Sequence, residues 1–233
     1  MKYFFYRSAI VLCILLYVAT ISYGQDNNAT KLGLDNSLYN GKYYTYFVSK
    51  DIKGDQFIKT KVFTHGKIWK NEVEFDSILL NYDVYNQDLI LKFNSREGAL
   101  KLIAISMANL DSFLLDNKLF IINRTITDDY YIFNKVEYKH QKFLIHYSKE
   151  LVLKTKLNDI QYEFNKLIST MHYSDGKKYY LVNNNHGLLR VINQDKKKEV
   201  KAFLKSKKYK LQKMSEPELL ELLILINNDI DDK

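Results

Sequence analysis

The chain has 233 residues, enough for one large domain or two small ones, and its 46% hydrophobic content allows a real core, which excludes a globally disordered protein. One Cys and one Pro exclude a disulfide framework, a Cys-rich zinc module and a proline-rich linker. The net charge is +8, but 31 Lys accompany only four Arg. Because proteins that read phosphates and bases favour the bidentate guanidinium of Arg, we expect no nucleic-acid partner.

The beginning of the chain predicts export. Residues 1–24 combine a positively charged start, an uncharged apolar run at 9–21 and the small-residue site Ser22-Tyr23-Gly24, as secretory signal peptides do. The apolar run of 13 residues is shorter than the roughly 20 that a spanning helix needs. We expect cleavage before Gln25 and a mature protein in the periplasm, the outer envelope or the medium. An uncleaved signal anchor and a lipid on Cys13 are the alternatives.

Residues 25–194 predict an antiparallel β domain. Aromatic and β-branched stretches are broken by turn signals at short spacing, which indicates a curved sheet or an open barrel of many short strands. Asp116-Asn117 and Asp175-Gly176 each predict a hairpin turn. Ser148-Lys149-Glu150 predicts a further hairpin turn, between strands at 143–147 and 151–154. The run from Asn183 to Gly187 is expected to lead into a last strand at 188–192.

Residues 195–233 predict two helices that pack on the β domain and cap it. Val200, Phe203 and Leu204 form an i, i+3, i+4 face within residues 195–206. A second helix begins at Ser215-Glu216-Pro217-Glu218, a capping box with Pro in the first turn. Its apolar stripe is expected to be buried against the sheet, and it consists of Leu219, Leu222, Leu223 and Ile226. The predicted fold class is therefore mainly β with C-terminal helices.

Two stretches carry a resemblance to a known family. They are residues 66–89, with Phe75-Asp76-Ser77-Ile78 and Tyr82-Asp83-Val84-Tyr85-Asn86-Gln87-Asp88, and residues 196–204 with the Leu-rich end that follows. Over roughly residues 54–227 the chain resembles an uncharacterised family of secreted proteins from Bacteroidota-type bacteria. The resemblance implies an envelope location and a fold of many short strands followed by a basic helix and a Leu-rich helix. It implies no catalytic residue.

The usual catalytic and metal-binding motifs are missing from the sequence, so we predict no catalytic, metal or cofactor-binding residue and no cofactor. The mature chain has no Cys and no Gly-x-Ser-x-Gly elbow, and its few glycines form no phosphate loop. One Glu-x-x-His spacing occurs, at Glu137 and His140, but it falls on an expected strand, where this offset points the two side chains to opposite faces. The five His form no wider ligand cluster; they are His65, His140, His146, His172 and His186. Asp83 and the pair Asp128-Asp129 are carboxylates of the kind that glycosidases use, but neighbours on a strand point to opposite faces.

Three features suggest contacts with other molecules. Residues 195–213 hold nine Lys and two acidic residues, which would suit a weak contact with an anionic surface, or else a solvated helix face. Asp76-Ser77-Ile78 matches the short pattern of an O-glycosylation acceptor in such bacteria. Seven tyrosines could line a ligand groove or could simply be good strand residues: Tyr43, Tyr44, Tyr46, Tyr130, Tyr131, Tyr179 and Tyr180.

These observations lead to three functional hypotheses. The first is an exported envelope protein without enzymatic activity that binds a ligand or partner on its curved sheet. The second is a structural or interaction protein that docks another envelope component through a sheet edge or the basic helix. The third is a hydrolase whose two carboxylates lie far apart in sequence. The partner and the oligomeric state are not specified by the sequence.

Overall fold

The computed structural model describes residues 38, 41–46, 52–95, 97–108, 110–123, 126, 131–156 and 159–227. The predicted signal peptide at residues 1–24, Cys13, Tyr130 and the pair Asp128-Asp129 lie outside the described residues. So does the proposed cleavage site before Gln25.

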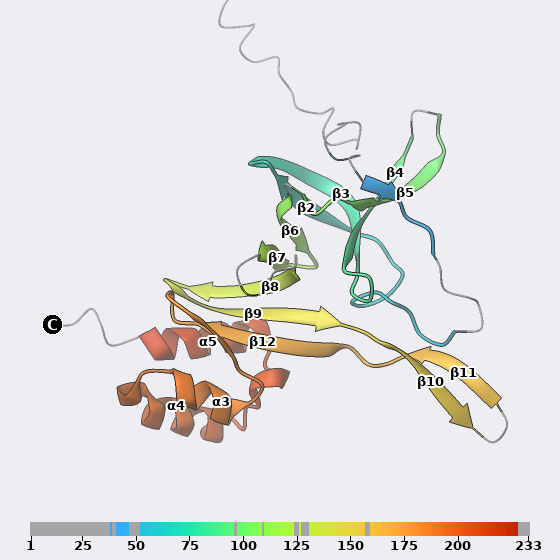
Figure 1. The fold of residues 1–233 in the computed structure, drawn as a ribbon. Coiled ribbons are helices and arrows are strands. Elements are labelled where there is room, and N and C mark those ends of the chain that lie inside the picture. The colour runs from blue at the N-terminus through green and yellow to red at the C-terminus, as the bar shows by residue number, and fades with distance from the viewer. Residues whose placement is uncertain are drawn as a thin grey trace, which may run out of the picture.

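The larger part of the fold is an 11-stranded antiparallel sheet that curves strongly from one end to the other (Figure 1). Its order is β1-β5-β4-β3-β2-β6-β7-β8-β9-β12-β13. The prediction of an antiparallel, curved sheet of short strands is confirmed. The strands are β1 (Gly41–Tyr43), β2 (Thr64–Lys70), β3 (Val73–Asp83), β4 (Asp88–Asn94), β5 (Leu100–Ile105), β6 (Leu110–Leu115), β7 (Lys118–Asn123), β8 (Tyr131–Tyr138), β9 (Gln141–Ser148), β12 (Ile168–Ser174) and β13 (Tyr179–Leu181).

A separate two-stranded hairpin, β10 (Leu151–Lys156) with β11 (Asp159–Phe164), leaves the sheet between β9 and β12 and projects from it (Figure 1). Ser148-Lys149-Glu150 was expected to join two paired strands, and that expectation is wrong. β9 pairs with β12, and β10 pairs with β11 instead. The turn residues were correctly placed, but they bend the chain out of the sheet rather than back along it.

Three helices and a short 3-10 turn cover the face of β8, β9 and β12 (Figure 1). They are α3 (Asn185–Val191), α4 (Gln194–Ser206), η1 (Leu211–Lys213) and α5 (Glu216–Asn227). Two helices were expected, and the strand predicted at 188–192 is in fact α3. The side chain of Asn184 accepts a hydrogen bond from the backbone N–H of Gly187 at 2.8 Å, so the Asn-rich run caps a helix.

The α5 helix forms as its sequence predicts. Glu218 accepts hydrogen bonds from the Ser215 backbone N–H at 2.6 Å and from the Ser215 hydroxyl at 2.9 Å, which completes the glutamate half of a capping box. Leu222 and Leu223 are fully buried, and α5 packs on β8 and β9. The expected burial of this helix against the sheet is confirmed.

The interior consists of two main apolar clusters. The first lies within the curl of β2 to β7 and is rich in aromatic rings, among them Phe113 and Phe120, which stack at 4.7 Å between ring centroids. The second lies between β8, β9, β12 and the helices, and it includes Phe143 and Leu223. Tyr147 on β9 packs against both clusters. The boundary between them is where the candidate site is found.

Candidate functional site

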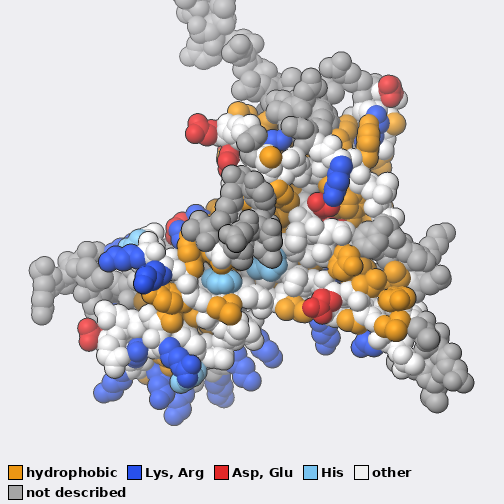
Figure 2. Space-filling model, viewed as in Figure 1, with side chains coloured by type: hydrophobic (Ala, Val, Ile, Leu, Met, Phe, Trp, Pro, Cys, Tyr) orange, Lys and Arg blue, Asp and Glu red, His pale blue; other side chains and the backbone are white. Residues whose placement is uncertain are grey.

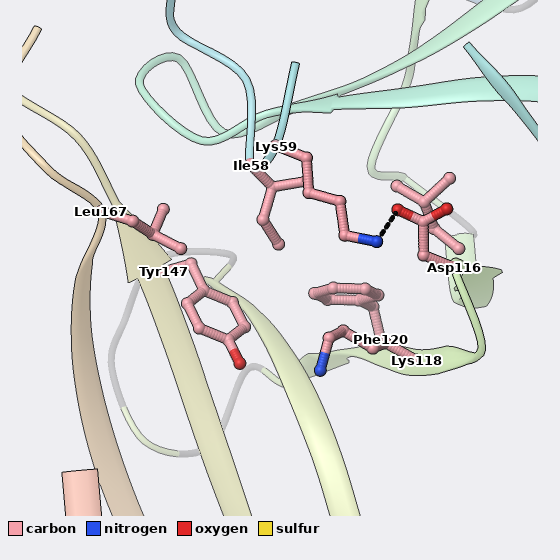
Figure 3. Close-up of a pocket in the computed structure, with 8 residues that line it drawn as sticks. Ile58, Lys59, Asp116, Lys118, Phe120, Tyr147 and Leu167 are labelled. Carbon is pink, nitrogen blue, oxygen red and sulfur yellow. Dashed lines mark ion pairs between the residues drawn. The ribbon is translucent and has the colours of Figure 1, made fainter. Parts of the chain in front are cut away.

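An apolar pit of about 130 Å³ opens at the boundary of the two clusters (Figure 3). Its walls are mainly hydrocarbon and aromatic, and Figure 3 shows the rings of Phe120 and Tyr147 beside the space between them. The lining comprises Ile58, Lys59, Leu115, Asp116, Lys118, Phe120, Tyr147 and Leu167.

Segments far apart in the sequence build the pit. Ile58 is fixed because its backbone N–H donates to the Tyr82 carbonyl at the end of β3, at 3.0 Å. Phe120 comes from the β6–β7 hairpin and is almost fully buried. Tyr147 comes from β9, and Leu167 from the link between the β10–β11 hairpin and β12. Leu167 is 39% exposed, so the pit is open to solvent along that side.

The charged groups at the rim are paired with one another. Lys59 contacts Asp116 at 2.8 Å across the mouth (Figure 3). Lys118 forms an ion pair with Glu216 at the start of α5, and the Asn134 amide donates to the same carboxylate at 2.8 Å. Each lysine at the rim thus faces a carboxylate, and the mouth of the pit is close to neutral.

A wider groove of about 600 Å³ shares the wall formed by Asp116 and Lys118. It runs between the β6–β7 turn, β8 and the first turn of α5, and its floor is more polar than that of the pit. Its remaining lining residues are Asn117, Lys135, Val136, Glu137, Ser215, Glu216, Pro217 and Leu220. The pit and the groove together form the candidate site.

The groove carboxylate Glu137 is held in its ionised form. Partial burial raises its pKa, but hydrogen bonds and attraction from Lys135 at 2.6 Å and Lys142 at 3.5 Å outweigh this, so the net pKa is lowered. A carboxylate with a lowered pKa donates a proton poorly near neutral pH. Glu137 is therefore poorly suited to act as a general acid at that pH.

Asp83, which lies in the stretch that carries the family resemblance, organises the β3–β4 turn. It is fully buried. One oxygen accepts from the backbone N–H groups of Tyr85 at 3.0 Å and Asn86 at 2.9 Å. The other accepts from the Tyr44 hydroxyl at 2.7 Å and the Asn86 amide at 2.8 Å. Burial and this hydrogen bond raise the pKa of Tyr44, so its hydroxyl remains a donor. Because Asp83 is buried and fully engaged, its role is structural.

Two of the five histidines considered in the sequence lie close together. His146 and His172 lie near each other, and both rings contact Phe133, at 5.7 and 5.8 Å between centroids. Burial lowers the pKa of both imidazoles, and in His172 the neighbouring His146 adds to the effect. Among the described residues, no group of three His, Cys, Asp or Glu could hold a metal ion.

Of the tyrosines proposed for a ligand groove, the described ones do not gather at one place, although the rings of Tyr44 and Tyr46 contact each other at 5.6 Å between centroids. Tyr43 on β1 is 71% exposed, whereas Tyr44 is buried against Asp83. Tyr179 and Tyr180 are on β13, at the opposite end of the strand order from β1. Tyr131 is described only through its backbone. Tyr147, which does line a cavity, was missed, although alternation along β9 placed it on the same face as the buried Phe143 and Ile145.

Ser77, the proposed glycosylation acceptor, lies exposed on β3 opposite the irregularity between Gly66 and Ile68 of β2. Its backbone φ is +58°, an uncommon value for serine. On the other edge of β2, Gly66 allows β6 to approach closely, since a Cβ there would lie 2.4 Å from the carbonyl oxygen of Leu114. The hydroxyl is accessible, and modification of Ser77 stays a prediction.

No family model matches the chain, and neither a curated protein nor a solved structure matches it. In the part of the chain that the structure describes, no helix has the length and apolar character needed to cross a membrane.

Proposed function

We propose that this is an exported cell-envelope protein that binds a partner through the pit and the adjoining groove. The observation that carries the proposal is their shared wall: an apolar cavity opens directly beside a wider polar channel. Such a combination suits an elongated partner that places one apolar group in the cavity and lays its polar remainder along the channel.

The size of the pit limits what can enter it. An engineered apolar cavity of about 150 Å³ in another protein holds benzene. A pit of about 130 Å³ therefore suits one aromatic ring or one branched aliphatic side chain, and not a whole lipid chain or sugar. Side chains of this kind are the usual anchors of protein interfaces. We therefore take the partner to be an extended segment of another envelope protein, anchored by a Phe or Leu side chain.

The charges at the rim support a polypeptide over an ionic ligand. Lys59 faces Asp116, and Lys118 faces Glu216, so a strongly charged ligand would have to break an ion pair to bind. A peptide backbone brings dipoles instead of a net charge. Ser215 and Asn117 in the groove provide hydrogen-bonding groups for it.

The binding chemistry can be tested with N-acetyl-phenylalanine amide and N-acetyl-leucine amide, with N-acetyl-alanine amide as the small control. We expect the first two to shift the methyl NMR signals of Ile58, Leu115 and Leu167, while the alanine amide leaves them in place. Leu167→Trp should fill the pit and abolish the shifts. Leu100→Trp, at another exposed leucine, is the matched control and should leave them unchanged. Equal shifts with all three amides, or none, would refute the proposal.

The β10–β11 hairpin offers a second candidate surface, in line with docking through a sheet edge. Leu153 and Tyr162 are register partners on one face, and they are 52% and 51% exposed. Phe164 on the same face packs against Tyr85 at 5.4 Å between centroids. Among the described residues β10 pairs with β11 alone, so its outer edge could accept an extended strand of an envelope protein.

Photocrosslinking distinguishes the two surfaces. A photoreactive phenylalanine analogue is placed at position 167, beside the pit, or at position 153, on the hairpin, and the protein is expressed in its own envelope. A cross-linked protein obtained from position 167 and lost on adding Phe120→Ala supports the pit. A product obtained from position 153 alone would move the binding surface to the hairpin.

A further inference from the structure

A dense group of lysines on the described part of the chain lies away from the pit. Figure 2 shows Lys and Arg side chains gathered along the outer side of α3 and α4. We define the basic face as five exposed lysines of α4 and the segment that follows it: Lys198, Lys201, Lys205, Lys208 and Lys210.

These lysines are not neutralised within the described chain. Two of their neighbours form ion pairs, Lys196 with Glu199 at 3.2 Å and Lys207 with Glu221 at 3.4 Å. Among the described residues, no carboxylate forms an ion pair with any lysine of the basic face. Lys198, Lys201 and Lys205 lie within about 60° of one another around the axis of α4, because successive residues of an α-helix are about 100° apart. The three positive charges therefore lie on the same side of α4.

The other side of α4 is already occupied. Val200 is fully buried and Leu204 almost so, and Phe203 packs against Tyr209 at 5.9 Å between centroids. A helix that inserts into a membrane needs a free apolar face. Because α4 has none to offer, any contact through the basic face must be made by charge at a surface.

We propose that the basic face docks the protein on a membrane surface rich in anionic phospholipid. Lysine ammonium groups are compact point charges, which suit many dispersed phosphates better than the bidentate recognition that arginine provides. Each lysine adds separately to attraction by an anionic bilayer. The pit and groove have no part in this contact, so the inference is independent of the proposed function.

The test is sedimentation of the mature chain with vesicles of phosphatidylglycerol mixed with phosphatidylcholine, compared with vesicles of phosphatidylcholine alone. We expect binding to the mixed vesicles only, strong at about 0.1 M salt and lost at about 1 M, where charges are screened within about 3 Å. The triple variant K198E/K201E/K205E should bind at least about 100-fold more weakly.

A matched control separates a local face from overall charge. K53E/K61E/K166E changes the net charge equally at three exposed lysines on other segments, and it should keep most of the binding. Equal loss in the two triple variants, or binding to pure phosphatidylcholine, would overturn the proposal. So would binding to double-stranded DNA at lower protein concentration than to the mixed vesicles. If the Glu variant melts early, K198Q/K201Q/K205Q tests the same face with less perturbation and should still weaken binding.

Discussion

Replacing Asp83 by Asn tests whether the buried carboxylate holds the β3–β4 turn. The two side chains have nearly the same shape, so packing is preserved and only the hydrogen bonds change. If the remaining oxygen keeps the backbone N–H groups of Tyr85 and Asn86, the new amide nitrogen faces the Asn86 amide nitrogen, and two donors oppose each other. The Tyr44 hydroxyl loses its acceptor at 2.7 Å.

The expected loss of stability follows from these contacts. Two hydrogen bonds to a charged acceptor disappear, and each contributes about 1.5–3 kcal/mol in a buried site. We therefore expect Asp83→Asn to lower the free energy of unfolding by about 3–6 kcal/mol. That is a large fraction of the roughly 5–15 kcal/mol by which a typical domain is stable.

Urea unfolding followed by the fluorescence of the single Trp, Trp69, measures this loss. Asp88→Asn is the matched control in the same turn. Burial raises the pKa of Asp88, with Lys42 only partly opposing this, so removing its charge should cost less than about 1 kcal/mol. Equal, small effects of the two substitutions would show that the Asp83 carboxylate does not hold the turn.

Three further predictions concern other parts of the chain. N-terminal sequencing of the exported protein should begin at or near Gln25; a chain that keeps Met1 in the cytoplasm would contradict export. Leu223→Ala should cost about 2–5 kcal/mol because Leu223 is fully buried, Leu223→Asp should prevent folding, and the half-exposed Leu220→Ala should cost far less, as thermal melting would show. Burial lowers the pKa of His146 and His172 in the folded state. As the pH falls, these imidazoles are therefore protonated first in the unfolded chain, where the pKa of His is about 6.5. Stability should therefore be full above that pH and decline below it, and His172→Phe should flatten the decline in urea midpoints measured from about pH 7.5 to about pH 5.

Local signals in the sequence were sufficient where a few neighbouring residues determine the structure. The Asp116-Asn117 turn has positive φ at both residues, and the strands on either side pair as predicted. The capping box at Ser215 likewise begins α5 as predicted. The failure at α3 has the same origin, because Asn184 can shape a loop or cap a helix. The packing of Leu188 into the second cluster, together with Leu189, Val191 and Ile192, favours the helix.

The candidate site could not be predicted in the same way, because its walls come from distant segments. Nothing near Ile58 or Leu167 in the sequence indicates that both border one cavity with Phe120. The Ser148-Lys149-Glu150 turn was visible, but the partner of each strand depends on long-range pairing. The composition suggested a groove lined by tyrosines. In the sheet, however, Tyr43 and Tyr179 lie on β1 and β13, the strands at its two opposite ends.

The position of β2 inside the sheet has a consequence for biogenesis. One edge of β2 pairs with β3, the next strand along the chain. Its other edge pairs with β6, which comes after β4 and β5 in the sequence. A chain that emerges N-terminus first would carry β2 to β5 as a meander with one long edge bare. Bare edges recruit strands from other chains, and aggregation begins in this way. A chaperone would therefore protect this protein most in the interval between the emergence of β2 and that of β6.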